Sequence, residues 1–201
     1  MSEFLQDDWQ CARQRVCFAN TRTKDTYPMC DTIRLRLGTS ADVPFLQDML
    51  RLAVCWQSGT PCPSLADLLA RPELHRIVAE WGRMGDTAIL AETEANSPVG
   101  AAWYRLWTPT HHSYGFVDPD TPELALAIMP AWRGRGLGTR LMHALIDHAQ
   151  SGGYLALSLS VDPRNPARRL YEALGFVKVG ETGTSWTMRL AMATARDIRH
   201  G

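Results

Sequence analysis

The chain has 201 residues, a length that suits one domain with a full hydrophobic core. Its 45% hydrophobic and 21% charged residues exclude a largely disordered or collagen-like chain. Because 21 Lys and Arg balance 21 Asp and Glu, the chain lacks the positive excess that binding along a duplex requires, and we expect no nucleic-acid partner.

The N-terminal part is polar and poorly periodic, and we treat residues 1–31 as an extension of unknown role. It lacks the apolar core of a signal peptide, and no stretch of the chain approaches the about 18 apolar residues of a membrane span. The cysteines form no CxxC pair, and we interpret all five as reduced thiols of a cytoplasmic protein. They are Cys11, Cys17, Cys30, Cys55 and Cys62.

Hydrophobic periodicity predicts one domain over residues 32–192, followed by a short tail, 193–201. The predicted strands cover 33–37, 87–92, 99–107, 124–128, 155–161, 176–179 and 186–190. The predicted helices run from a cap at Thr39 or Ser40 to Ala53, from Ser64 to Trp81 with a break at Pro72, over 138–150 and over 166–174. This order indicates a mixed sheet covered by helices.

A glycine-rich turn, Arg133-Gly134-Arg135-Gly136-Leu137-Gly138-Thr139, joins an apolar strand to a helix. Glycines let a backbone approach a ligand closely, and the free N–H groups of a helix N-terminus attract an anion such as a pyrophosphate. A Walker A loop would need Lys where Thr139 follows Gly138, and a dinucleotide fold would need GxGxxG and a later acidic residue. The turn therefore indicates a different phosphate cradle, or a turn that binds no ligand.

Two segments resemble the GCN5-related N-acetyltransferase (GNAT) superfamily. The run from Leu126 to Gly138 is similar to its acetyl-CoA signature (R/Q-x-x-G-x-G/A), and Asn165 to Phe176 is similar to its second signature. The resemblance covers roughly the last 170 residues and implies an α/β fold with a mixed, mostly antiparallel central sheet of six to seven strands flanked by helices. It also implies that strands 4 and 5 splay apart, with acetyl-CoA in the wedge.

Cofactor contacts follow from the resemblance. The backbone of the fourth strand is expected to pair with the pantetheine arm, the glycine-rich turn to hold the pyrophosphate, and Asn165 to lie near the arm as well as to cap the next helix. The predicted acetyl-CoA residues are Leu126, Ala127, Ile128, Arg133, Gly134, Arg135, Gly136, Leu137, Gly138, Thr139 and Asn165. Arg135, Arg168 and Arg169 either touch CoA phosphates or face solvent.

Two residues match catalytic positions of the superfamily. Tyr171 corresponds to the general acid that protonates the departing thiolate, although its place on an apolar helix face also fits simple packing. Glu123 corresponds to the general base of the histone acetyltransferase branch, or is a hydrated carboxylate at a strand end, with water removing the amine proton instead. Some ribosomal-protein acetyltransferases have a fifth-strand glutamate where this chain has Ser160.

The acceptor site is expected near the third strand and the loop before the fourth, where a carboxylate could hold an ammonium and indoles could add cation–π attraction. The candidates are Trp103, Tyr114 and Asp118, with Trp107, His111, His112 and Asp120 nearby. Trp103 and Trp107 also fit ordinary core positions. His143 and Asp147 read as a solvated i, i+4 pair.

These observations predict transfer of acetyl from acetyl-CoA directly to a primary amine of a small molecule or peptide, with no metal and no covalent enzyme intermediate, because no Cys matches a nucleophile position. A homodimer is possible. The alternative from a different class is a non-catalytic acyl-CoA-binding sensor, in which the cradle survives without turnover.

Overall fold

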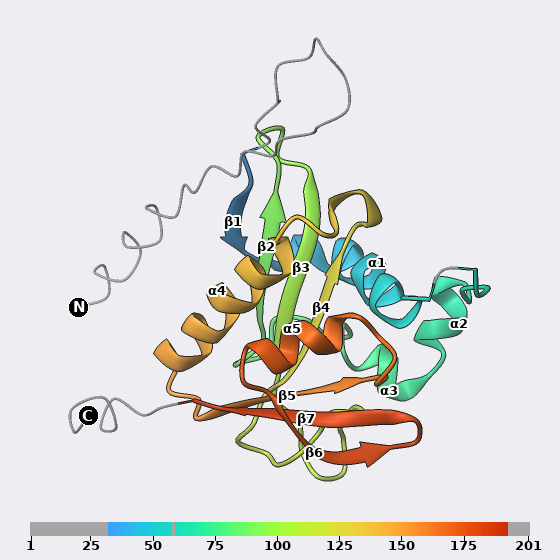
Figure 1. The fold of residues 1–201 in the computed structure, drawn as a ribbon, viewed down its shortest axis with the longest axis vertical. Coiled ribbons are helices and arrows are strands. Elements are labelled where there is room, and N and C mark those ends of the chain that lie inside the picture. Colours follow the sequence, from blue (N-terminus) through green and yellow to red (C-terminus); the bar gives the residue numbers. More distant parts are fainter. Residues whose placement is uncertain (1–31, 58, 193–201) are drawn as a thin grey trace.

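The computed structural model describes residues 32–57 and 59–192, which form a seven-stranded sheet with helices on both faces (Figure 1). The strands are β1 (Arg34–Leu37), β2 (Thr87–Glu92), β3 (Pro98–Arg105), β4 (Glu123–Ile128), β5 (Ala156–Val161), β6 (Val177–Thr182) and β7 (Ser185–Ala191). The helices are η2 (Ser40–Asp42), α1 (Val43–Val54), α2 (Leu65–Leu69), α3 (Pro72–His75), η3 (Pro130–Trp132), α4 (Leu137–Ser151) and α5 (Ala167–Ala173). The N-terminal extension and the C-terminal tail lie outside the described residues.

The sheet order is β1-β2-β3-β4-β5-β7-β6, and every pairing is antiparallel except that of β4 with β5. These two parallel strands share one registered pair, Glu123 with Ser158. On its other side β4 pairs with β3 along its whole length, from Arg105–Glu123 to Gly100–Ile128. Beyond Glu123 the edge of β4 that faces β5 has no sheet partner among the described strands. The predicted mixed sheet with splayed fourth and fifth strands is confirmed.

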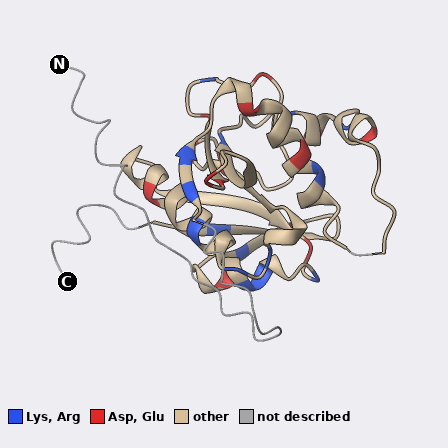
Figure 2. Cartoon of the chain, turned by 90° about the horizontal axis from the view of Figure 1, so that it is seen from above, with Lys and Arg blue, Asp and Glu red and all other residues tan. Residues whose placement is uncertain are grey.

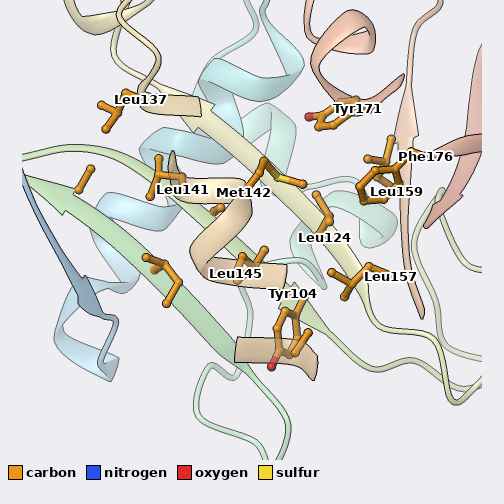
Figure 3. Packing of buried hydrophobic residues seen from close by; sticks show 14 of the residues in the cluster. Tyr104, Leu124, Leu137, Leu141, Met142, Leu145, Leu157, Leu159, Tyr171 and Phe176 are labelled. Atoms are coloured by element: carbon orange, nitrogen blue, oxygen red, sulfur yellow. The ribbon is translucent and has the colours of Figure 1, made fainter. Parts of the chain in front are cut away.

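Alternating side chains of the central strands feed two separate cores, one on each face of the sheet. α4 and α5 cover the first core, in which Leu141 and Leu145 meet Leu124 and Leu159 (Figure 3). α1, α2 and α3 cover the second, in which Leu46 and Leu50 of α1 meet Trp103 of β3. Consecutive β4 residues therefore point to opposite cores, which decides the face on which each candidate site residue lies.

The first strand and the first helix are joined by an ion-pair network. The side chains of Thr39 and Asp42 form a capping box at η2, and Arg36 donates to both carboxylate oxygens of Asp42 at 2.8 and 2.6 Å. Hydrogen bonding by Arg36 lowers the pKa of Asp42 to about 2. Arg36 also pairs with Glu92 of β2 at 2.6 Å. The predicted alternation holds less well at Leu37, which is 47% exposed because it lies at the end of the edge strand.

The loop that follows α1 contradicts one expectation from the sequence. Cys55 and Cys62 are joined by a disulfide with their Cα atoms 5.5 Å apart, so the interpretation of all five cysteines as reduced thiols is wrong for this pair. Spacing alone could not reveal the bond, because it depends on the return of the loop toward the end of α1. Cys11, Cys17 and Cys30 lie outside the described residues. The cytoplasmic assignment, which rested on reduced thiols, loses that support.

Basic and acidic residues both occur on several elements of the described fold (Figure 2). This distribution agrees with a formal net charge of zero. Among the described residues we find no helix with the length and apolar character to cross a membrane.

Candidate active site

The glycine-rich turn lies between the end of β4 and the start of α4. Gly134 and Gly136 both have positive φ angles, 72° and 73°, a conformation that L side chains rarely adopt, and a Cβ on either would meet open space. Gly136 is the N-cap of α4. Among the described residues, the N–H groups of Leu137, Gly138 and Thr139 find no backbone acceptor. The turn therefore presents free donors and the positive end of a fifteen-residue helix to one small space.

Close packing fixes the position of this helix start. A Cβ on Gly138 would lie 3.2 Å from Leu170 of α5 and 3.3 Å from Ile128 of β4, so glycine lets α4 begin close to both elements. Leu137 is buried, while Thr139 is exposed on the first turn. Sequence reasoning placed these residues at a phosphate cradle, and the backbone has the geometry that such a cradle needs.

The two arginines of the turn have separate contacts. Arg133 donates from Nε to the carbonyl of Ile128 at 2.9 Å, which ties the turn to the end of β4. The Arg135 guanidinium lies 5.1 Å from the ring centre of Trp132, within cation–π range. Both residues are exposed and keep positive charge beside the free N–H groups.

The unpaired edge of β4 and the start of α5 flank the gap between β4 and β5. Leu126 and Ile128 are half-buried toward the α4 and α5 core, and Ala127 is buried toward the other. Asn165 follows β5 and accepts the N–H of Ala167 through Oδ1 at 2.9 Å. The N-cap of α5 is Pro166, one residue later than the predicted cap at Asn165. The residues expected to bind acetyl-CoA through backbone groups therefore border one opening in the sheet.

The arginines of α5 differ in their surroundings. Arg168 donates to Glu172 at 2.5 Å and to the carbonyl of Pro163 at 2.9 Å, and it also lies 5.4 Å from the ring centre of Trp186. Arg168 is half-buried, and Arg169 is exposed. Of the two, Arg169 is the more accessible to a phosphate.

Tyr171 lies on α5 and faces the core that α4 covers. It is 6% exposed and packs edge to face against Phe176, with ring centres 5.9 Å apart. Figure 3 shows its phenol oxygen directed away from the Phe176 ring. Burial raises the pKa of Tyr171 above its ordinary value of 10.0, so the phenol keeps its proton at any physiological pH. The packing and acid interpretations are therefore compatible, because a buried phenol can still donate its proton.

Glu123 begins β4 at the point where β4 and β5 diverge, on the opposite face from Tyr171. It is 8% exposed, so the alternative of a hydrated carboxylate at a strand end is wrong. Oε1 accepts the N–H of Gly115 at 2.8 Å, and Oε2 has no hydrogen-bond partner among the described residues. Burial raises the pKa of Glu123 to about 7, against the opposing effects of Gly115, Trp107 and Ser113. A carboxyl with a pKa near 7 can take up a proton at neutral pH.

The loop before β4 closes over Glu123. A Cβ on Gly115 would lie 2.6 Å from the carbonyl carbon of Leu159, 2.7 Å from the nitrogen of Ser160 and 2.9 Å from Glu123 Oε1. Only glycine fits in this position. Arg76 holds the same loop by donating to the carbonyl of His112 at 3.0 Å.

A cavity of about 10 Å³ lies beside Glu123, lined in part by Trp103 and Trp107. Both indoles are buried, and the Trp103 nitrogen has no partner among the described residues. Trp107 lies close enough to Glu123 to act on the pKa of its carboxyl as a hydrogen-bond donor. The volume suits one water molecule.

Arg105 lines the same cavity but is fully engaged. It forms a bidentate ion pair with Asp86 at 2.8 Å for each hydrogen bond, and it donates to the carbonyls of Arg76, Ala79 and Glu80. Desolvation lowers the pKa of Arg105. This buried pair anchors the segment between α3 and β2 under β3.

The predicted acceptor residues do not come together. Trp103 joins Glu123 at the small cavity, whereas Tyr114 is 37% exposed on the loop. Asp118 accepts hydrogen bonds from Thr121 and from the N–H of Asp120, and it lines a separate groove of about 500 Å³ near Arg189.

The histidine candidates form no hydrogen bond with Glu123 among the described residues. His111 is exposed, and His112 stacks on Phe116 with ring centres 4.7 Å apart. His143 and Asp147 are both exposed on α4. The described residues contain no group of three His, Cys, Asp or Glu side chains suited to a metal ion.

Comparison with known proteins establishes the family. A model of the Acetyltransferase (GNAT) family matches residues 52–176. The chain therefore belongs to the GNAT acetyltransferase family.

Individual relatives match over shorter spans. An L-2,4-diaminobutyric acid acetyltransferase from Nocardia farcinica is 37% identical over 57 residues, which are 26% of this chain and 30% of the relative. An L-methionine sulfoximine/L-methionine sulfone acetyltransferase from Pseudomonas aeruginosa is 30% identical over 100 residues, 49% of this chain and 55% of the relative. The chain thus spans between about a third and about half the length of these curated relatives.

A solved structure shows the same fold. A GNAT superfamily phosphinothricin acetyltransferase from Sinorhizobium meliloti, in complex with AcCoA, superposes with a TM-score of 0.57 at 19% identity, covering 82% of this chain and 91% of that chain.

Sequence reasoning missed several residues at this site. Ser113, Gly115 and Ser158 surround Glu123, but nothing in their local sequence distinguishes them from ordinary loop and strand residues. Arg105 carried a usable signal, because an arginine between two tryptophans in an alternating strand faces the same side as both.

Proposed function

We propose that the chain is an acetyl-CoA-dependent N-acetyltransferase that transfers acetyl directly to a primary amine of a small molecule or peptide. The observation that carries this proposal is the opening between β4 and β5, which has a glycine-rich helix start at its wide end and Glu123 at its closed end. The family match and the fold shared with a protein solved with AcCoA support it.

The residues around the opening fit the cofactor. The free N–H groups of the α4 start suit the pyrophosphate, and the open space at Gly134 and Gly136 leaves room for it. The unpaired edge of β4 suits the amide groups of the pantetheine arm, which would pair with it as a strand does. Acetyl-CoA, when bound there, supplies an activated acetyl thioester.

The two candidate catalytic groups lie on opposite faces of the sheet at the same opening. Glu123 accepts a proton from the acceptor ammonium, directly or through a water, which frees the nitrogen lone pair for attack on the thioester carbon. The C–N bond forms, the C–S bond breaks, and the acylated nitrogen loses its second proton, which passes through solvent and restores the Tyr171 phenol after that phenol has protonated the thiolate. Tyr171 gives its phenol proton to the departing thiolate, and its raised pKa keeps that proton in place until then.

Two relatives carry amino acids or their analogues in their names, and an N-alpha-acetyltransferase RimI from Mycobacterium tuberculosis also matches, so the relatives leave both a small molecule and a peptide as candidate acceptors. The identity of the acceptor is tested by titrating acetyl-CoA and free CoA by calorimetry and then following thiol release over a panel of polyamines, amino acids, aminoglycosides and short peptides. We expect binding of acetyl-CoA and thiol release that depends on an amine. Absence of binding would contradict the proposal, and binding without turnover on any amine would favour the sensor alternative.

A further inference from the structure

A groove of about 500 Å³ lies at the end of the sheet where β4 and β5 begin. The loop before β4 contributes Asp118 and Asp120 to its walls, and the turn before β5 contributes Leu155. β7 contributes Arg189. The volume is typical of small-molecule sites, which range from about 300 to 1,000 Å³. The proposed acetyl transfer uses none of these residues.

The groove and the expected pyrophosphate cradle lie at opposite ends of β4 (Figure 1). Asp118 and Asp120 precede β4 in the chain, whereas the turn around Gly136 follows it. The six residues of β4 span roughly 20 Å when extended. A small molecule in the groove therefore leaves the cradle free.

Arg189 brings a positive charge to this groove that no described residue neutralises. Its registered neighbours, Ser158 on β5 and Val177 on β6, are uncharged. Among the residues that the structure describes, the Arg189 guanidinium forms no hydrogen bond and no ion pair. The side chain is half-buried, so water screens its charge less than at an open surface. Its planar fork of N–H donors suits the two oxygens of a carboxylate.

Asp120 brings the opposite charge to the same groove. Its carboxylate is exposed and accepts no hydrogen bond from any described residue. The neighbouring Asp118 is already engaged, because it accepts the Thr121 hydroxyl at 2.9 Å and the Asp120 N–H at 3.0 Å. Within the described part of the chain, no ion pair joins Arg189 to either aspartate. The groove therefore holds two opposite charges that leave each other unpaired.

Apolar side chains complete the walls of the groove. Leu155 is 59% exposed, and Leu106, which follows β3, lines the groove with it. Exposed apolar surface bordered by a few polar groups is typical of ligand-binding grooves. A ligand that matches all the walls carries a carboxylate, an ammonium and an apolar group.

We infer that this groove is a second binding site, for a free amino acid with an apolar side chain. The ligand carboxylate pairs with the Arg189 guanidinium, and the ligand ammonium pairs with the Asp120 carboxylate. The ligand side chain packs against Leu106 and Leu155. A simple anion or a simple cation would satisfy one charge of the groove and be repelled by the other, whereas a zwitterion satisfies both. The inference goes beyond the proposed acetyl transfer and does not depend on it.

The test compares L-leucine with two analogues that each lack one of its charges. 3-Methylbutylamine lacks the carboxylate, and 4-methylpentanoate lacks the ammonium. Each is titrated by calorimetry into the full chain without acetyl-CoA, so that no acetyl is available for transfer. We expect the amine to bind at least about tenfold more weakly than leucine, because it loses the charged hydrogen bonds to Arg189. We expect the acid to bind at least about threefold more weakly, since Asp120 is exposed. Absence of leucine binding, or equal binding of leucine and either analogue, overturns the inference.

Variants assign the binding to the groove. In Arg189→Gln we expect leucine affinity to fall at least about tenfold and the preference for leucine over 3-methylbutylamine to approach one, because both ligands then meet a neutral side chain. Asp120→Asn should weaken leucine binding about threefold. Arg71→Gln and Asp48→Asn are the matched controls, since both residues are exposed and neither lines the groove, and leucine affinity should stay unchanged. Unchanged affinity in Arg189→Gln overturns the inference.

Glu123→Gln distinguishes the groove from the proposed transfer site. We expect this variant to bind leucine as the unchanged protein does. Leucine binding that is weakened by Glu123→Gln and spared by Arg189→Gln would place the amino acid at the transfer site and overturn the inference. Acetyl-CoA binding and thiol release are measured separately, so failure of one proposal leaves the other standing. Melting temperatures show whether each variant is folded, and the comparison of leucine with its analogues carries the test if a variant fails to fold.

Discussion

The two ends of the β4–β5 opening are built in opposite ways. At the wide end, the turn around Gly134 and Gly136 is exposed, its glycines meet open space, and its donors come from the backbone. At the closed end, Glu123 is buried under a loop that fits only because residue 115 is glycine, and the unsatisfied groups are side chains.

This difference suits two different ligands. Backbone N–H groups at a helix start recognise a phosphate whatever the side chains are, so the wide end suits a constant cofactor. Side-chain donors and acceptors in a small buried space discriminate between ligands, so the closed end suits a selected acceptor. Changes at one end should therefore affect one ligand and spare the other.

The largest effect is expected from Glu123→Gln, which removes the base and keeps the shape. We expect kcat/KM to fall on the order of 100- to 1000-fold, as for the loss of a general base. In the unchanged protein kcat/KM should rise with pH through about 7 as the carboxyl ionises, and this limb should vanish in the variant. A pH–rate profile measures both, and an unchanged rate would assign proton removal to water alone.

Tyr171→Phe tests the acid on the other face. Because the ring and its packing on Phe176 remain, we expect acetyl-CoA affinity to be retained while kcat falls about 100-fold. Calorimetry and steady-state thiol release give the two quantities. Equal losses of affinity and turnover would indicate that Tyr171 is only a packing residue.

The burial of Glu123 should also make the free energy of unfolding depend on pH. Its pKa is higher in the folded protein than the ordinary 4.5, so the folded state holds the proton more tightly than the unfolded state does. The resulting stabilisation is complete below about pH 4.5 and is lost as the pH rises through about 7. The free energy of unfolding changes by on the order of 3 kcal/mol. Urea unfolding between pH 5 and pH 8 should show this fall in the unchanged protein and a flatter curve for Glu123→Gln.

Gly115→Ala tests how tightly the closed end is packed. The added methyl would overlap backbone atoms of β5, and we expect a loss of about 2 kcal/mol in the free energy of unfolding. Gly180→Ala is the control, because Gly180 likewise has no positive φ and a Cβ there would meet its nearest neighbour only at 3.9 Å. Similar losses in the two variants would mean that loss of the glycine itself, rather than the overlap at Glu123, causes the effect.

A smaller effect is expected at the wide end. Gly136→Val places a β-branched residue at a φ of 73°, which should distort the start of α4 and weaken acetyl-CoA binding about tenfold. Gly136 lies past the end of β4 that is opposite to Glu123. The pH dependence of kcat/KM at saturating acetyl-CoA should therefore be unchanged. If kcat/KM of this variant no longer rises with pH through about 7, the two ends are coupled.

The sequence predicted the wide end better than the closed end for a physical reason. The cradle depends on glycines and a helix start that follow each other in the chain, from Arg133 to Thr139, so a local pattern reveals it. The residues around Glu123 are Ser113, Ser158, Trp103 and Trp107. They come from separate strands and a loop, and only the fold of the sheet brings them together. Asp118 was proposed from its place in the loop before the fourth strand and its carboxylate, and in the structure it accepts a hydrogen bond from Thr121 in its own turn.

The elements of the fold were likewise predicted where the sequence signal is local. Alternation and caps predicted the strands and most of the helices, because those signals are local. The helical stretch predicted as far as Trp81 ends at His75. The bond between Cys55 and Cys62 and the burial of Arg105 against Asp86 depend on how loops return to the sheet, and neither was predicted.

The division between the two ends is tested most directly by comparing the acetyl-CoA binding isotherms of Glu123→Gln and Gly136→Val with that of the unchanged protein. We predict that the Glu123→Gln isotherm overlays the unchanged one and that Gly136→Val binds about tenfold more weakly. The opposite pattern, with acetyl-CoA binding weakened by Glu123→Gln and spared by Gly136→Val, would contradict the assignment of the cofactor to the wide end.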